Sequence, residues 1–334
     1  MEVVKIVKLT KESKNNILEG LLKRSPNSYG QYESAVNAII EDVKTRKDEA
    51  VFEYTKKFDK ADINAENILV TEEEIKEAYE QVDASLVEII RKAIVNIRVY
   101  HEKQKQYSWF DSTPQGTILG QKVTAIESVG VYVPGGKAAY PSSVLMNVIP
   151  AKVAGVEQII MTTPPDKEGK VTPTTLVAAK EAGVTAIYKV GGAQAIAALA
   201  FGTQTIPKVD KIVGPGNAFV AEAKRQVFGK VSIDMIAGPS EIMVVADNTN
   251  NPVHIAADLL SQAEHDRLAS AVLVTDSMDF AIKVQTEIEN QLKNLKRGEI
   301  ARASIDNYGK IIVTSDIDNA IEDRKSTRLN SSHD

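Results

Sequence analysis

The 334-residue sequence contains no cysteine. This absence excludes disulfides, zinc sites built from thiolates, and iron–sulfur clusters. It also excludes a catalytic thiol, so an aldehyde could not be oxidised here through a thiohemiacetal. Any such oxidation would have to activate the aldehyde in another way.

Other common signals are also missing. The formal net charge is -5, which argues against a nucleic-acid partner because nucleic-acid binding needs a clustered basic face. No apolar run approaches the roughly 18–20 residues of a membrane helix, so no membrane partner is expected. The N-terminus lacks the apolar core and cleavage site of a signal peptide. We therefore expect a cytoplasmic protein, and 334 residues suggest two or three domains.

The middle of the chain alternates between short apolar runs and helical patterns. Strands are predicted at 131–133, 158–161, 186–190, 211–213 and 232–236, and helices at 142–155, 173–183, 193–202 and 217–228. Strands separated by helices of this length form βαβ units and a parallel sheet.

Both flanks of this region have patterns of their own. Helical patterns cover 32–58, 72–82 and 84–107, strands are predicted within 118–133, and a second run follows with strands at 242–246, 271–275 and 310–314 and helices at 253–269 and 280–292. We therefore predict an α/β protein with two Rossmann-like parallel-sheet domains, one inserted in the other, and a helical N-terminal region. The predicted divisions are an N-terminal arm at 1–27, a discontinuous domain at 28–130 plus 240–322, an inserted domain at 131–239, and a tail at 323–334.

Three of the predicted strands end in glycine-rich turns that carry a polar residue. These turns are Tyr132-Val-Pro-Gly-Gly136, Gly191-Gly-Ala-Gln194 and Gly214-Pro-Gly-Asn217. Ligands of open α/β sheets bind beyond the carboxyl ends of strands, and adjacent glycines let a ligand approach the backbone. Each turn alone is more simply a strand–helix connection, and Asn217 is a plausible helix N-cap as well as a ligand contact. Repetition favours one nucleotide crevice, although Phe219 replaces the last glycine of a dinucleotide fingerprint.

Gln262 and His265 lie three residues apart on the predicted helix at 253–269, where they would share a face. Histidine is the commonest metal ligand, but a single Gln-x-x-His pair on a helix is more often solvated surface. Zinc takes four ligands, or three and a water, and only two are visible here. His101 and His254 could contribute by number alone.

Two acids flank the Gly238-Pro-Ser240 turn. Asp234 precedes it and Glu241 follows it. We interpret both as hydrogen-bonding turn residues rather than as an acid/base pair.

Taken together, these segments resemble the histidinol dehydrogenases. The motifs that carry the resemblance are VGVYVPGG (129–136), VGGAQAIAALAFGT (190–203), VDKIVGPGNAFVAEAK (209–224), IAGPSEIMVVAD (236–247) and LLSQAEHD (259–266). The likeness extends from about Tyr54 to Val313. It implies an NAD-dependent oxidation of L-histidinol to L-histidine in two steps through an enzyme-bound aldehyde. It also implies zinc in each active site and a homodimer with exchanged segments.

The resemblance also implies roles for individual residues. Tyr132, Gln194 and Asn217 match NAD contacts, so the inserted domain at 131–239 would bind NAD. The substrate-binding positions are Ser240, Gln262 and His265, of which Gln262 and His265 are also zinc ligands. The lack of cysteine fits, because the family oxidises an aldehyde hydrate with a carboxylate and a histidine. Two other functions stay open: a nucleotide-binding relative without redox activity, and a dehydrogenase of another amino alcohol or polyol.

The sequence departs from the family near its end. The family's catalytic Glu-His pair and its remaining zinc ligands, an aspartate and a histidine, have no counterpart before Glu322. Residues 323–334 are polar and unlike the family, so we interpret them as a non-native, disordered tail and do not count His333 as a ligand. We therefore expect an incomplete first domain, no catalytic pair, weak zinc binding, a weakened homodimer and impaired turnover.

Overall fold

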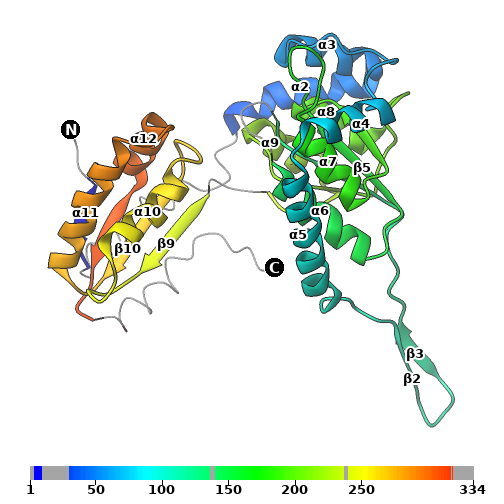
Figure 1. Ribbon diagram of the computed structural model, residues 1–334. Helices are drawn as coiled ribbons and strands as arrows, with labels where there is room; N and C mark the ends of the chain where they lie inside the picture. Colours follow the sequence, from blue (N-terminus) through cyan, green and yellow to red (C-terminus); the bar gives the residue numbers. More distant parts are fainter. Residues whose placement is uncertain (1–3, 10–29, 136–139, 237–239, 317, 319–334) are drawn as a thin grey trace. The chain divides into compact units, whose positions relative to one another are not determined.

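The computed structural model describes residues 4–9, 30–135, 140–236, 240–316 and residue 318, so the tail at 323–334 lies outside the described residues. The chain forms two compact units (Figure 1). One joins residues 1–28 to 237–334, and the other comprises 29–236. Each unit contains a parallel β-sheet. The predicted α/β class, with one sheet unit inserted in the other, is therefore confirmed.

The unit of residues 29–236 is built on a five-stranded parallel sheet in the order β6-β5-β4-β7-β8. The strands are β4 (Ser128–Tyr132), β5 (Gln158–Thr163), β6 (Ala186–Lys189), β7 (Lys211–Val213) and β8 (Ser232–Ile233). From β4 the chain adds β5 and β6 on one side, then crosses to add β7 and β8 on the other. The carboxyl ends of β4 and β7 therefore form a topological switch point, where doubly wound sheets bind ligands.

Helices cover both faces of this sheet. On one face, α6 (Pro141–Val153) and α7 (Pro173–Ala182) pack with α4 (Glu72–Gln81) and α5 (Ala84–Glu102). On the other face, α8 (Gly192–Phe201) and α9 (Ala218–Val227) pack with α2 (Gly30–Arg46) and α3 (Asp48–Phe58). Strand side chains alternate between the two faces. Val131 accordingly joins the α6–α7 side, and Tyr132 joins the α8 side.

The domain division differs from the one predicted, which assigned residues 28–130 to the other sheet. The structure places α2 to α5 on the five-stranded sheet. The physical reason is clearest at α8, where every residue from Ala193 to Ala200 is buried. A helix that is apolar all round needs a second covering layer, and α2 and α3 supply it. The helical pattern at 32–58 is also two helices, because the chain turns at Lys47, whose φ is 57°.

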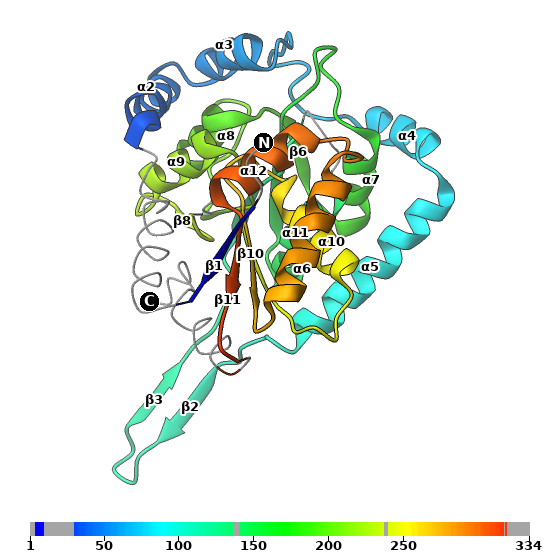
Figure 2. The ribbon, with the colours of Figure 1, turned by 90° about the vertical axis from the view of Figure 1, so that its left-hand side faces the viewer.

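A β-hairpin extends from the same unit (Figure 2). It pairs β2 (Trp109–Ser112) with β3 (Ile118–Gln121) in an antiparallel register. The side chains of both strands are exposed, including Trp109, Phe110, Ile118 and Leu119. The strand β2 was not predicted, because its four residues carry no apolar alternation.

The unit of residues 1–28 and 237–334 contains a four-stranded parallel sheet in the order β1-β11-β10-β9. The strands are β1 (Lys5–Lys8), β9 (Glu241–Val245), β10 (Ser270–Thr275) and β11 (Lys310–Val313). An apolar cluster joins one face to α10 (Pro252–Ala263), α11 (Met278–Leu292) and α12 (Gly298–Tyr308). The predicted N-terminal arm thus contributes a strand, and α12 was not predicted. No helix in the described ranges is long and apolar enough to cross a membrane.

Candidate functional site

Tyr132 links two of the predicted glycine turns. It ends β4, and its hydroxyl accepts a hydrogen bond from the backbone N–H of Gly192 at 3.2 Å. The ring is buried, and this burial raises the pKa of Tyr132 to about 12, with the negative charge of Asp59 adding to the rise. Tyr132 is therefore a neutral side chain that holds the turn after β6 against the end of β4.

Gln194 lies in the first turn of α8 with its amide buried and unpaired. The residue is 1% exposed, and neither Oε1 nor Nε2 has a hydrogen-bond partner among the described residues. The amide folds back over Gly192, where φ is +65° and an added Cβ would lie 2.6 Å from Oε1. A buried amide without partners is costly, and a helix N-terminus favours anionic ligand groups. This arrangement suits a ligand that hydrogen-bonds to Gln194.

The third turn lies against the same strand end. Gly214 has φ +112°, and an added Cβ would lie 2.1 Å from the carbonyl oxygen of Tyr132, so only glycine fits. Three residues on, Asn217 caps α9: its Oδ1 accepts from the N–H groups of Phe219 at 3.0 Å and Val220 at 3.1 Å. The structure therefore brings Tyr132, Gly192, Gln194 and the Gly214 turn to one edge of the sheet, and Asn217 follows directly.

A buried ion pair fixes this third turn. Lys224 of α9 is 3% exposed, donates from Nζ to the carbonyl oxygen of Gly214 at 3.0 Å, and pairs with Asp234. Asp234 in turn accepts from the N–H of Gly214 at 2.8 Å through Oδ2. The interpretation of Asp234 as a hydrogen-bonding turn residue is confirmed. Nothing in the sequence pattern pointed to Lys224, because it is far from Gly214 along the helix.

Two further polar residues at this edge were missed by the sequence reasoning. Asp59 caps the end of α3, with Oδ2 buried and unpaired among the described residues, and burial raises the pKa of Asp59 to about 6. Thr162, near the end of β5, has a buried Oγ1 that also lacks a partner there. Asp59 reads as an ordinary helix end in the sequence, and Thr162 as a strand residue, so neither gave a signal.

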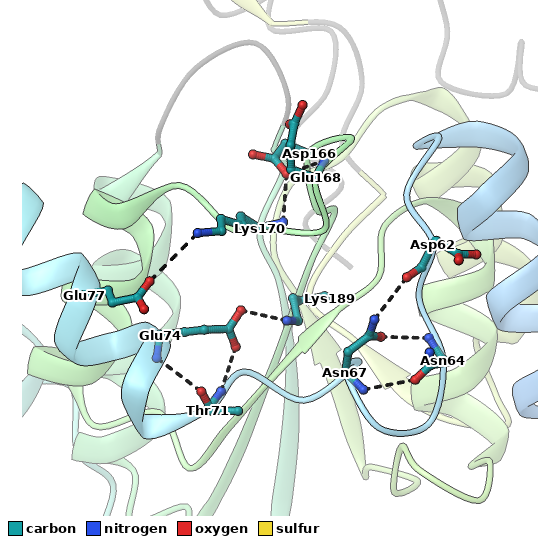
Figure 3. Close-up of polar contacts among 10 residues, drawn as sticks. All are labelled: Asp62, Asn64, Asn67, Thr71, Glu74, Glu77, Asp166, Glu168, Lys170 and Lys189. Carbon is teal, nitrogen blue, oxygen red and sulfur yellow. Dashed lines mark hydrogen bonds and ion pairs between the residues drawn. The ribbon is translucent and has the colours of Figure 1, made fainter.

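A second polar cluster on the same unit is fully paired and structural (Figure 3). Lys189, only 4% exposed at the end of β6, pairs with Glu74 of α4 at 2.8 Å. Glu74 also forms a capping box with Thr71, which begins α4. This network fastens α4 to the sheet.

The three residues expected to contact substrate belong to the other unit. The carbonyl oxygen of Ser240 accepts from the N–H of Ser270 at 3.1 Å, which places Ser240 at the start of the β9–β10 pair. Gln262 lies in the last turn of α10, and its carbonyl oxygen accepts from the N–H of His265 at 3.2 Å. The prediction that His265 lies on this helix was wrong: α10 ends at Ala263, and His265 is exposed in the turn that follows.

The additional histidines considered as ligands lie in other parts of the described chain. His254 lies in the first turn of α10, at the opposite end from Gln262. His101 belongs to the other unit, where its Nδ1 lies 2.6 Å from Oε1 of Gln104. Across the described ranges, no group of three or more His, Cys, Asp or Glu residues could hold a metal ion. The imidazole of His265 is a common type of zinc ligand, whereas the amide oxygen of Gln262 is an uncommon one.

The fold and this edge define a doubly wound α/β protein with glycine turns and an unpaired, buried amide at its switch point, where sheets of this kind bind ligands. A family model described as Histidinol dehydrogenase matches residues 22–326. The chain belongs to the histidinol dehydrogenase family.

Individual relatives agree with this assignment. Histidinol dehydrogenase from Bacillus subtilis (strain 168) is 60% identical over 302 residues, which are 90% of this chain and 70% of the relative. The enzyme from Geobacillus kaustophilus (strain HTA426) is 59% identical over 288 residues, or 86% and 68% of the two chains. A crystal structure of histidinol dehydrogenase from Elizabethkingia anophelis superposes with a TM-score of 0.90 at 38% identity, covering 98% of this chain and 75% of that one.

Proposed function

We propose that the chain performs the chemistry of its family, the NAD-dependent oxidation of L-histidinol to L-histidine. The observation that carries this proposal is the buried, unpaired amide of Gln194 at the switch point of a chain that belongs to the family. Each of the two oxidations transfers a hydride from the substrate carbon to NAD and releases a proton. A water molecule adds to the aldehyde between them.

NAD would bind along the edge formed by the three turns. Gln194 offers both a donor and an acceptor, and the glycine at 192 lets this amide fold back over the turn, while Gly214 lets the third turn pack against the carbonyl oxygen of Tyr132. Asn217 uses its oxygen to cap α9, so its amide nitrogen is the atom suited to a ligand. Tyr132 shapes the edge as a neutral phenol that holds the turn after β6.

Gln262 and His265 would hold zinc, and Ser240 would contact histidinol. Zinc, when bound, would orient the substrate through its amino group and imidazole and polarise the reacting oxygen. Gln262 and His265 lie on either side of the end of α10 and are joined by a backbone hydrogen bond. Because His265 lies in the turn after the helix, its side chain is not fixed to a helix face. Among the described residues we assign none the role of catalytic base.

The test is NADH formation by the purified 334-residue chain with L-histidinol and added zinc, compared with its Gln194→Ala variant. We expect NADH to form in the presence of histidinol, and Gln194→Ala to raise the KM for NAD by about tenfold, since a lost ligand hydrogen bond is worth about 1 kcal/mol or more. The rate also tests the expectation of impaired turnover. NAD binding without turnover would fit both impaired turnover and the non-redox alternative, whereas faster turnover of another amino alcohol or polyol would favour the other dehydrogenase.

A further inference from the structure

Three residues in the described ranges have buried side-chain atoms without any hydrogen-bond partner. They are Asp59 through Oδ2, Thr162 through Oγ1, and Gln194 through Oε1 and Nε2. Buried polar groups are nearly always paired, so each such atom needs an explanation. All three residues belong to the unit of residues 29–236.

The three residues share one face and one edge of the five-stranded sheet. Thr162 lies opposite Tyr132 of β4 and Tyr188 of β6 in the strand register. Both tyrosines, and Ile160 two residues before Thr162, belong to the apolar cluster on the α3–α8 face. Strand alternation therefore turns Thr162 to this face. Gln194 lies on α8, and Ala61, two residues after Asp59, belongs to the same cluster.

The packing of α3 on α8 brings Asp59 toward Gln194. Helix α3 begins beside the end of α8, where Lys47 donates from Nζ to the carbonyl oxygen of Gly202 at 3.1 Å, and α3 then packs along α8, so its other end at Asp59 lies toward the first turn of α8. The phenol of Tyr132 accepts from the N–H of Gly192, over which the amide of Gln194 is folded. Asp59 and Gln194 are therefore parts of one polar patch beside the switch point.

Among the described residues, Oδ2 of Asp59 has no hydrogen-bond partner. The carboxyl stands at the C-terminus of α3, where the helix dipole disfavours a negative charge. Nearby lysines are engaged elsewhere: Lys56 pairs with Asp62 at 3.0 Å, and Lys60 donates to the carbonyl oxygen of Lys57. A partly buried carboxyl with an orphaned oxygen in this position points to a ligand that donates hydrogen bonds.

We propose that Asp59 determines cofactor specificity, its carboxylate accepting hydrogen bonds from a ribose diol of NAD in a subsite completed by Gln194 and Thr162. The inference rests on the proposed NAD-dependent function. Dinucleotide folds commonly place an acid on the ribose hydroxyls, where it excludes the 2′-phosphate of NADP by like-charge repulsion. In this chain the acid would come from the end of α3 rather than from a strand end.

The test compares NAD and NADP affinities, measured by titration calorimetry, of the full chain and of three variants. Asp59→Asn should weaken NAD binding by about tenfold and reduce the preference for NAD over NADP by at least as much, because a hydrogen bond to a charged group is lost and the repulsion is removed. Thr162→Val should weaken NAD binding by about fivefold. Asp62→Asn is the matched control on the same loop, where Asp62 is 85% exposed, and should stay within about twofold.

The outcomes separate this inference from the proposed function. If the unmodified chain binds NAD and Asp59→Asn changes neither its affinity nor its preference, the role of Asp59 is wrong while the proposed function stands. If the unmodified chain binds no NAD, both are overturned. Asp59→Glu keeps the charge and should keep NADP excluded; loss of that exclusion would also overturn the inference, even if the asparagine variant failed to fold.

Discussion

Asp59 illustrates a residue whose ligand role would conflict with stability. Its pKa is raised from 3.8 to about 6, because burial disfavours the charged form. The folded state therefore holds its proton more tightly than the unfolded state, so stability from this group is present below about pH 4 and is lost as the pH rises through 6.

We predict that Asp59→Asn stabilises the protein at pH 8. Two pKa units correspond to on the order of 3 kcal/mol, and partial exposure reduces this to about 1–2 kcal/mol. Urea unfolding at pH 8 and pH 4 would measure the difference, which should shrink at pH 4. A variant that is less stable at pH 8 would show that the carboxylate has a structural partner.

Substitutions at Asn217 can distinguish its role as the cap of α9 from its proposed role in ligand binding. We predict that Asn217→Asp keeps helix stability, because its carboxylate can accept from the N–H groups of Phe219 and Val220 as Asn217 does. Asn217→Ala should lower the free energy of unfolding by about 1 kcal/mol. If the amide nitrogen contacts NAD, both variants should lose NAD affinity in calorimetry; unchanged affinity in Asn217→Asp would leave Asn217 a cap alone.

Among the elements, the buried ion pair that joins α9 to the Gly214 turn matters most for the site. Lys224 and Asp234 together bond both backbone groups of Gly214, so they fix the turn against β4. We predict that Lys224→Met lowers the free energy of unfolding by about 1–3 kcal/mol, since it leaves a partly buried carboxylate without its cation. Adding Asp234→Asn should recover part of that loss in a double-mutant cycle. Additive losses would mean that the two side chains act independently.

Element types followed well from the sequence, whereas element ends did not. The βαβ run from β4 to β8 was predicted strand by strand, because period-2 and period-3.6 patterns are local. The end of α10 was not, since the predicted pattern continued to residue 269 and the helix stops at Ala263. That difference moves His265 from a helix face to a turn and removes the geometric argument for its pairing with Gln262.

At the scale of the whole molecule, the prediction concerns the affinity and stoichiometry of zinc binding. Gln262 and His265 would fill two positions of a tetrahedral shell and leave the others to water. We predict weak, non-stoichiometric zinc binding in equilibrium dialysis of the 334-residue chain. Tight binding that His265→Ala abolishes would show that further residues complete the shell.

The amino-acid sequence sufficed for the α/β class, the glycine turns that meet at the switch point, and membership of the family. These properties depend on short segments of the chain, because hydrophobic periodicity and turn residues are features of near neighbours in the sequence. Long-range packing settled the rest. The helices α2 to α5 joined the five-stranded sheet because the wholly buried α8 needs a second apolar layer. The same packing lays α3 along α8 and leaves Oδ2 of Asp59 without a partner among the described residues, a placement that depends on which surfaces bury each other.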